Sequence, residues 1–396
     1  MRELPRTAWL LILGSFINRF ASFAVFYLVL FLTRRGFSPA RAGLAVAAWG
    51  VGEVLASLVG GHLADRLGRR TTIALSMFGS AVAVLAVSRM TAYAAIVPVA
   101  FVAGLATEMF RPAGAALIAD AVPERQRVTA FALLRFAVNL AIAGGAVVAA
   151  ILVAHSFTWV FYTDAATSVL FGIVALVALP EGTRVRKGEE APGSGYVAAL
   201  ADRGFALFLM ASIVAAFVYF QQQAALPLHV RAGGLTDRDF GLLLALNGLM
   251  IVLFELPLSA WSMRKPPRSM IAFGFVLVGI GFGLTAVAHS LPALFATVAV
   301  WTLGEMIGAP VGYAYVAGIA PAHMRGRYQG LYGLCWSSGT VTAPAIGAYL
   351  VVTAPTLFWV GCGALGLVSA LLALSGRAVR SATGRAPSGL PTGPAG

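Results

Sequence analysis

The sequence predicts an all-α integral membrane protein with twelve transmembrane helices arranged as two six-helix bundles. Three observations predict this fold: 59% hydrophobic but only 11% charged residues, a mean hydropathy of +0.87, and successive apolar stretches that fill nearly all of the 396 residues. A hydrocarbon core about 30 Å thick needs about 20 apolar residues per helix. The composition therefore excludes an ordinary soluble domain.

The apolar stretches divide the chain into twelve predicted spans, each bounded by charged or turn-forming residues. The first is longer than the core of a signal peptide and is followed by Arg34 and Arg35 rather than a small-residue cleavage site, so we expect it to be retained. In chain order the spans are 7–33, 40–61, 70–89, 92–119, 128–153, 158–180, 204–230, 236–262, 269–289, 291–320, 327–352 and 355–375.

The net charge of +13 is distributed unevenly over the loops. Of the 28 lysines and arginines, nineteen fall on the side that carries both termini and six on the opposite side. By the positive-inside rule the first side is cytoplasmic. We therefore expect a multi-pass protein of the inner or plasma membrane with both termini in the cytoplasm. The same distribution explains the basic charge without nucleic acid as a partner.

The longest polar interruption lies at mid-chain and predicts a flexible cytoplasmic linker. The last residues are rich in Ser, Gly and Pro, a composition typical of disorder. The predicted division is 1–180 for the first six-helix bundle, 181–203 for the linker, 204–376 for the second bundle and 377–396 for a disordered tail.

The two halves are related by an internal repeat. An offset of 198 residues places Pro112 against Pro310 and Arg70 against Arg268, at equivalent span ends. We interpret this as a parallel duplication. Transporter folds with internal repeats commonly place a substrate path at the interface of the repeats.

The stretch GGHLADRLGRR, residues 60–70, carries an unusual density of charge between the second and third spans. Gly61 and Gly68 bracket Asp65 at a spacing typical of a helix end followed by a tight turn. This loop resembles the signature loop of the major facilitator superfamily, and twelve spans in two related halves agree with that resemblance.

The resemblance implies that the loop forms a latch between the halves on the cytoplasmic side. Asp65 is expected to face the helix that begins near Gly326, and Arg69 to pair with Asp120. A carboxylate at a helix N-terminus contributes about 0.3–1 kcal/mol, enough to bias two conformations without locking either. The predicted latch residues are Gly61, Asp65, Arg66, Gly68, Arg69, Arg70 and Asp120.

Ionisable residues inside predicted spans are costly in a bilayer and are functional candidates by default. Four in the first half are predicted to couple transport to protons: Arg19, Glu53, Glu108 and Arg111. Glu108 and Arg111 stand three residues apart and can pair, so a purely structural ion pair is the alternative. Arg135 lies near the cytoplasmic end of its span, where it either snorkels to the surface or has a functional role.

The second half has fewer charges in its spans and more neutral polar and aromatic residues, a combination that suits an amphipathic organic molecule. A single aromatic residue in a helix is more often a packing residue, and that alternative stays open for each. The predicted substrate-binding residues are Gln222, Gln223, Asn247, Glu255, Trp301, Glu305, Tyr313 and Trp336.

Together these features predict a secondary active transporter that exports amphipathic organic compounds, drug-like or natural-product molecules, by proton-coupled alternating access. The alternatives are an uptake symporter or facilitator for a metabolite such as a peptide or sugar, and a membrane sensor that does not transport. We find no nucleophile–base set, metal-ligand cluster or phosphate loop, so no enzyme activity is predicted. We expect no cofactor or metal, a proton gradient as energy source, a small-molecule substrate, protons and the lipid bilayer as partners, and a monomer.

Overall fold

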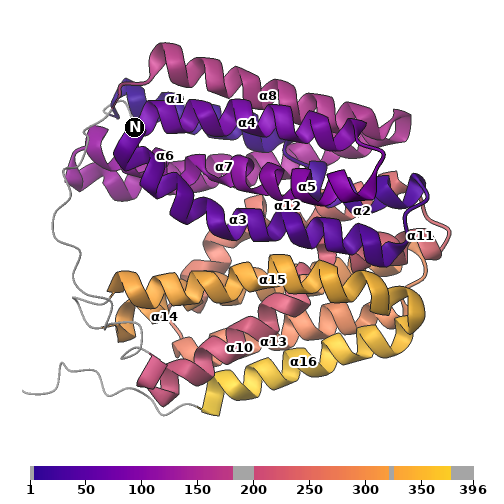
Figure 1. The fold of residues 1–396 in the computed structure, drawn as a ribbon. Coiled ribbons are helices and arrows are strands. Elements are labelled where there is room, and N and C mark those ends of the chain that lie inside the picture. Colours follow the sequence, from indigo (N-terminus) through magenta and orange to yellow (C-terminus); the bar gives the residue numbers. More distant parts are fainter. Residues whose placement is uncertain (1–3, 182–199, 321–324, 376–396) are drawn as a thin grey trace, which may run out of the picture.

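The computed structural model describes residues 4–181, 200–320 and 325–375, which are helical and contain no strand (Figure 1). Most of the predicted linker and all of the predicted tail lie outside these ranges. The first half comprises α1 (Arg6–Ala21), α2 (Ala24–Arg34), α3 (Pro39–Leu67), α4 (Arg69–Arg89), α5 (Tyr93–Glu108), α6 (Phe110–Ala121), α7 (Glu124–His155) and α8 (Phe157–Ala178).

The second half repeats this plan below the first in Figure 1. It comprises α10 (Arg203–Tyr219), the 3-10 turn η1 (Phe220–Gln223), α11 (Ala225–Ala232), α12 (Asp237–Ser262), α13 (Pro267–Leu284), η2 (Thr285–Val287), α14 (Leu291–Ile319), α15 (Arg325–Thr353) and α16 (Pro355–Ser375). We call the end of the bundles where α8 ends and α10 begins the linker end, and the opposite end, where α2 ends and α12 begins, the far end.

Local sequence explains where several helices begin. The Ser38 hydroxyl accepts the backbone N–H of Arg41 and is followed by Pro39, an N-cap pattern that starts α3. Thr236 and Asp239 form a reciprocal capping box at the start of α12. These caps stand outside the membrane, where the unpaired N–H groups of a first turn would otherwise be left to water.

Eleven helical stretches in the described part of the chain are long and apolar enough to cross a membrane. The remaining predicted span corresponds to α15, whose 29 residues extend about 43 Å and so exceed the bilayer core. Polar residues such as Ser337, Ser338 and Thr342 lower its hydropathy. This helix packs against α3 and α10, so the twelve-helix fold is present with one span of unusual polarity.

Three crossings that the sequence predicts as continuous are interrupted. The fourth breaks at Met109, between α5 and α6. The first breaks at Ser22 and Phe23, between α1 and α2, and the seventh breaks at η1 and Ala224, between α10 and α11. The offset of 198 residues carries Ser22 onto Phe220, so the breaks of the first and seventh crossings occupy equivalent places in the repeat. Broken helices at matching positions of two halves are typical of transporter binding regions.

The second span is longer than predicted. Helix α3 continues from Gly61 through to Leu67, so Gly61 lies inside the helix and the loop to α4 is reduced to Gly68. The predicted span ends at residue 61 because hydropathy falls at the membrane surface, whereas the helix itself continues beyond it. Gly68 has a φ of +92°, a conformation that favours glycine.

The halves share one apolar core at the far end and have separate apolar cores at the linker end. One apolar core, with Tyr27, Phe157, Phe240 and Trp301 among its members, draws on both halves at the far end. At the linker end the first half has its own core around Ile73 and the second half has another. The structure is therefore a state closed at the far end.

Glycines allow this closure. A methyl group at Gly50 of α3 would lie 2.4 Å from the Thr340 carbonyl oxygen of α15, and one at Gly43 would lie 2.3 Å from the Pro344 carbonyl oxygen. Contacts this short are repulsive, so the two backbones meet only because both positions lack a side chain.

Replacing Gly50 by alanine is expected to destabilise the structure by about 1–3 kcal/mol, because the added methyl group must push α3 away from α15. The measurement is the melting temperature of the purified protein in detergent. Gly361→Ala is the matched control, since a methyl group there meets nothing within 4 Å. Equal melting temperatures for both variants would show that the close approach is not required.

Candidate functional site

The charged residues predicted in the first half gather around Glu108, at the end of α5. Arg111 of α6 donates from Nη1 to Glu108 Oε2 at 2.8 Å, and Arg19 of α1 forms an ion pair with Glu108 Oε1. The Glu108 side chain is 11% exposed, whereas that of Arg111 is 69% exposed. The helix is interrupted at Met109 between the two partners. Glu108 is thus a largely buried carboxylate between two guanidinium groups.

Glu53 of α3 belongs to the same group of charges. Trp49 Nε1 donates to Glu53 Oε1 at 3.0 Å, and Glu53 lies within Coulomb range of Glu108, Arg19 and Arg111. Among the ion pairs of the described residues, Glu53 takes part in none. When both acids are ionised, their negative charges cancel the positive charges of the two arginines. Binding of one proton gives the group a net charge of +1.

The second half holds a carboxylate with neutral partners. Tyr219 Oη donates to Glu305 Oε1 at 2.9 Å, and Asn247 Nδ2 donates to Glu305 Oε2 at 3.1 Å. Asn247 also contacts the Thr302 hydroxyl at 3.1 Å. The Glu305 site therefore offers several oxygen atoms around one acid, with hydrogen-bond donors from α10 and α12.

Aromatic rings pack against Tyr219, which donates a hydrogen bond to Glu305. Tyr219 meets the rings of Trp301 and Trp336 edge-on, with centroids 6.0 and 5.8 Å away. Trp336 is partly buried, and the 47% exposed Tyr313 meets Tyr332. Trp301 is only 1% exposed and stacks on Phe282 of the core, so it acts as a packing residue in this state. Tyr313 is therefore far more accessible than Trp301 in this state.

Gln222 and Gln223 lie in η1, at the break of the seventh crossing, and both are buried. Their neighbour Gln221 packs against Gly347 of α15, where its side-chain oxygen occupies the place that a methyl group would take. Glutamines at an unwound turn supply hydrogen bonds that the broken helix lacks.

Arg135 and Glu255 join the two halves. Arg135 of α7 forms an ion pair with Glu255 Oε1 of α12, and Asn139 Nδ2 donates to Glu255 Oε2 at 2.9 Å. Arg135 therefore has a partner in the other half, although its side chain stays 56% exposed. Glu255, predicted as a substrate residue, is engaged by the first half in this state.

The predicted latch residues are partly brought together. Arg69 forms an ion pair with Asp120 and donates to the Ala116 carbonyl oxygen at 2.8 Å. Arg70 pairs with Glu181 at 2.7 Å. Arg66 is exposed, a methyl group at Gly61 would meet open space, and the Asp65 side chain lies outside the described residues, as do those around Gly326. The expected approach of Asp65 to α15 thus stays a prediction.

Arg69→Ala is expected to lower the maximal transport rate several-fold, because the Asp120 carboxylate then loses its partner at the linker end. Rates in proteoliposomes, normalised to the amount of folded protein, provide the measurement. The double variant Arg69→Asp with Asp120→Arg restores an ion pair with reversed polarity and should recover part of the rate. If the single variant transports at the normal rate, the pair has no role in switching.

Sequence reasoning missed Asp164, a 1% exposed carboxylate in the middle of α8. The rule that flagged Glu53 applies equally to Asp164, because it stands within a predicted span. Among the described residues there is also no group of three or more His, Cys, Asp or Glu side chains that could hold a metal ion.

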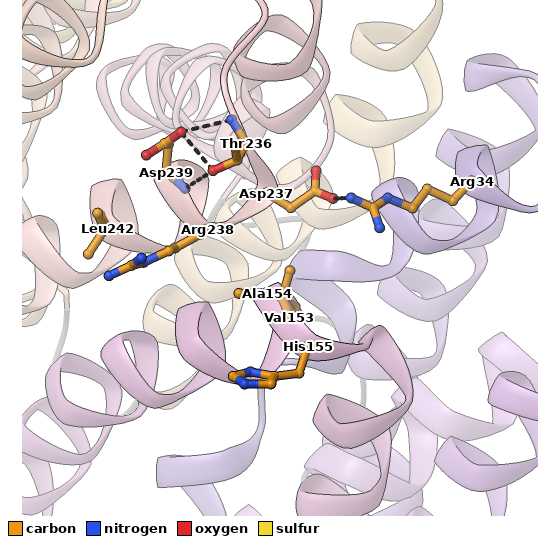
Figure 2. A pocket seen from close by; sticks show the side chains of 9 residues that line it. All are labelled: Arg34, Val153, Ala154, His155, Thr236, Asp237, Arg238, Asp239 and Leu242. Atoms are coloured by element: carbon orange, nitrogen blue, oxygen red, sulfur yellow. Dashed lines mark hydrogen bonds and ion pairs between the residues drawn. The ribbon is translucent and has the colours of Figure 1, made fainter.

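Sequence reasoning also missed an ion-pair cluster at the far end. Asp237, at the start of α12, is 5% exposed and pairs with Arg34 of α2 at 2.6 Å and with Arg231 of α11 at 3.0 Å. Arg231 also donates to the Thr33 hydroxyl at 2.8 Å. Figure 2 shows Arg34 reaching Asp237 beside a pocket of about 530 Å³. The charged residues of this ion-pair cluster lie at the ends of the predicted spans, where they resemble ordinary loop residues.

The chain matches a protein family and is similar in sequence to known proteins. The sequence model of the Major Facilitator Superfamily matches residues 11–236 and 208–395. The chain is 25% identical to a Na(+), Li(+), K(+)/H(+) antiporter of Planococcus maritimus, with 92% of each chain covered. It is 26% identical to the multidrug resistance protein MdtH of Aeromonas hydrophila, covering 94% of this chain and 95% of the relative.

Solved structures resemble the fold. The nucleoside transporter NupG superposes with a TM-score of 0.80 at 14% identity, covering 93% of this chain and 99% of that one. A POT family transporter in complex with a thioalcohol conjugated peptide gives a TM-score of 0.78 at 14% identity, covering 93% and 95%. At this identity the likeness concerns the arrangement of the helices alone.

Proposed function

The chain belongs to the major facilitator superfamily of membrane transporters, and on this premise we propose that it is a proton-coupled exporter of amphipathic organic compounds. The observation that carries the proposal is Glu108, held between Arg19 and Arg111 beside a second acid, Glu53. Protonation of one acid changes the net charge of this group, and a change of charge in a low-dielectric site alters the balance between two conformations.

The second half supplies the substrate contacts. Glu305 with Tyr219 and Asn247 provides a polar anchor, while Trp336 and the exposed ring of Tyr313 provide apolar surface. Such a combination binds molecules with an apolar body and one polar or positively charged group. The relative named as a multidrug resistance protein supports this substrate class.

During alternating access the far end opens and the linker end closes. With the linker end in the cytoplasm, which the distribution of positive charges supports, the present state is closed to the outside. The chain works as a monomer in the inner or plasma membrane with both termini in the cytoplasm. It needs a proton gradient and no cofactor.

A second candidate, exchange of alkali cations for protons, is favoured by the oxygen atoms around Glu305. The Tyr219 hydroxyl contacts this carboxylate directly, and the Thr302 hydroxyl lies one hydrogen bond further away, beyond Asn247 Nδ2. Hard cations prefer such oxygen ligands. The relative named as a Na(+), Li(+), K(+)/H(+) antiporter points the same way.

Flux measurements in proteoliposomes test these functions together. With an acidic lumen, an antiporter accumulates an amphipathic cationic dye in the lumen as protons leave. With an acidic exterior, a symporter accumulates it instead. Dissipating the gradient with a protonophore should abolish the accumulation. Proton release that requires external Na⁺ or K⁺ and ignores the dye would favour cation exchange, and flux that is independent of pH would overturn proton coupling.

A further inference from the structure

Asp164 lies at the break of the first crossing. The break separates α1 from α2 at Ser22 and Phe23, and the backbone N–H of Ala24, the first residue of α2, interacts with the Asp164 carboxyl group. Asp164 is only 1% exposed. The carboxyl group therefore sits at the positive end of an eleven-residue helix, inside the membrane.

Two acceptor oxygens near the break lack a hydrogen-bond partner. They are Oδ1 of Asp164 and Oδ1 of Asn18, which is 0% exposed. Asn18 Nδ2 donates to the Ser168 hydroxyl at 3.0 Å, and Ser168 lies one helical turn from Asp164 on the same face of α8. An unpaired carboxylate oxygen at this depth is costly. A proton on Asp164 lowers that cost, because a neutral carboxyl group is less costly to bury than a carboxylate.

One charged side chain acts on Asp164 from the neighbouring helices, namely Arg19 of α1, which is within Coulomb range and is paired with Glu108. Of the other described cations on the helices packed against α8, Arg6 is exposed at the start of α1 and the rest are engaged elsewhere. Arg34 pairs with Asp237, Arg69 with Asp120, Arg70 with Glu181 and Arg135 with Glu255, Arg89 donates to Tyr162, and His155 contacts the Ile151 carbonyl.

We propose that Asp164 is a second proton-carrying site of this transporter, and that Arg19 alternates between Glu108 and Asp164 as the proton comes and goes. In the present state Asp164 holds the proton and Arg19 pairs with Glu108. When Asp164 releases its proton to water, the carboxylate stays at the N-terminus of α2 and gains Arg19 as a counter-charge, and Glu108 keeps Arg111. This rests on the proposed proton coupling and adds a site that links it to the break in the first crossing.

Infrared difference spectroscopy of the purified full-length protein tests the site without any transport assay. We expect a carbonyl band of a protonated aspartic acid that disappears as pH rises. Selective ¹³C labelling of aspartate carboxyl groups should shift that band in the wild-type protein, which needs no substitution. Asp164→Asn retains an acceptor for the Ala24 N–H and should lose the band, whereas Asp164→Glu should replace it with a band that aspartate labelling does not shift.

The outcomes separate this proposal from the proposed function. A wild-type spectrum without a label-sensitive band, or a band that persists in Asp164→Asn, would overturn the proton site whether or not transport depends on protons. A band that NaCl removes and choline chloride does not would replace the proton with an alkali cation and also overturn it. Proton-independent flux together with the expected band would refute the proposed coupling while leaving a protonated Asp164.

Discussion

Glu108→Gln is expected to abolish accumulation driven by a pH gradient while leaving exchange of substrate across the membrane measurable. The glutamine cannot carry a proton, and it leaves Arg19 and Arg111 without the carboxylate between them. Removing one partner of a buried ion pair costs about 3–5 kcal/mol. Arg111 contributes less to that cost because its side chain is exposed. We expect the ratio of accumulation with and without the gradient to fall about tenfold or more, toward one, since 1.4 kcal/mol already corresponds to tenfold.

Glu108→Asp is the matched control, because it keeps an ionisable carboxyl group at the same position. It should retain gradient dependence with an altered rate. Melting temperatures of both variants in detergent separate loss of coupling from loss of fold. Full gradient dependence in Glu108→Gln would reduce the Arg19–Glu108–Arg111 group to a structural ion pair, the alternative that the spacing of Glu108 and Arg111 left open.

Asp237→Asn is expected to open the far end. The carboxylate accepts Arg34 from one half and Arg231 from the other, and Arg231 reaches further to Thr33. Without this carboxylate, the guanidinium groups of Arg34 and Arg231 face each other at the closed far end. Arg34 is 57% exposed, so solvent weakens its share. A loss of about 1.4 kcal/mol shifts the ratio of closed to open states tenfold, and we expect a shift of roughly that size.

Spin labels at the exposed positions Thr91 and Ala232, one in each half at the far end, report this change. Electron–electron double resonance should give a longer distance between the labels in Asp237→Asn than in the otherwise unchanged protein. Asp237→Glu retains the charge and should keep the short distance. An unchanged distance distribution in Asp237→Asn would show that the apolar core shared by Tyr27 and Phe240 closes the far end by itself.

The sequence predicted the crossings better than the ends and breaks of helices. Hydropathy located each span because the bilayer core imposes a minimum length of apolar residues. It could not show that α3 continues to Leu67, since helical hydrogen bonds persist beyond the membrane surface. It also gave no sign of the break at Ser22, because Ala, Ser and Phe occur freely in helices and a break depends on what neighbouring helices offer to the freed backbone groups.

What the sequence by itself determined is which spans carry charge, since a charge in a predicted span is visible from its position alone. What only the tertiary structure decided is the partner of each charge. Arg19 lies within Coulomb range of Glu53, Glu108 and Asp164, and the rotation of α1 against α5 and α8 selects Glu108 as its partner. That rotation depends on side chains packed across the whole bundle, which no periodicity along a single helix records.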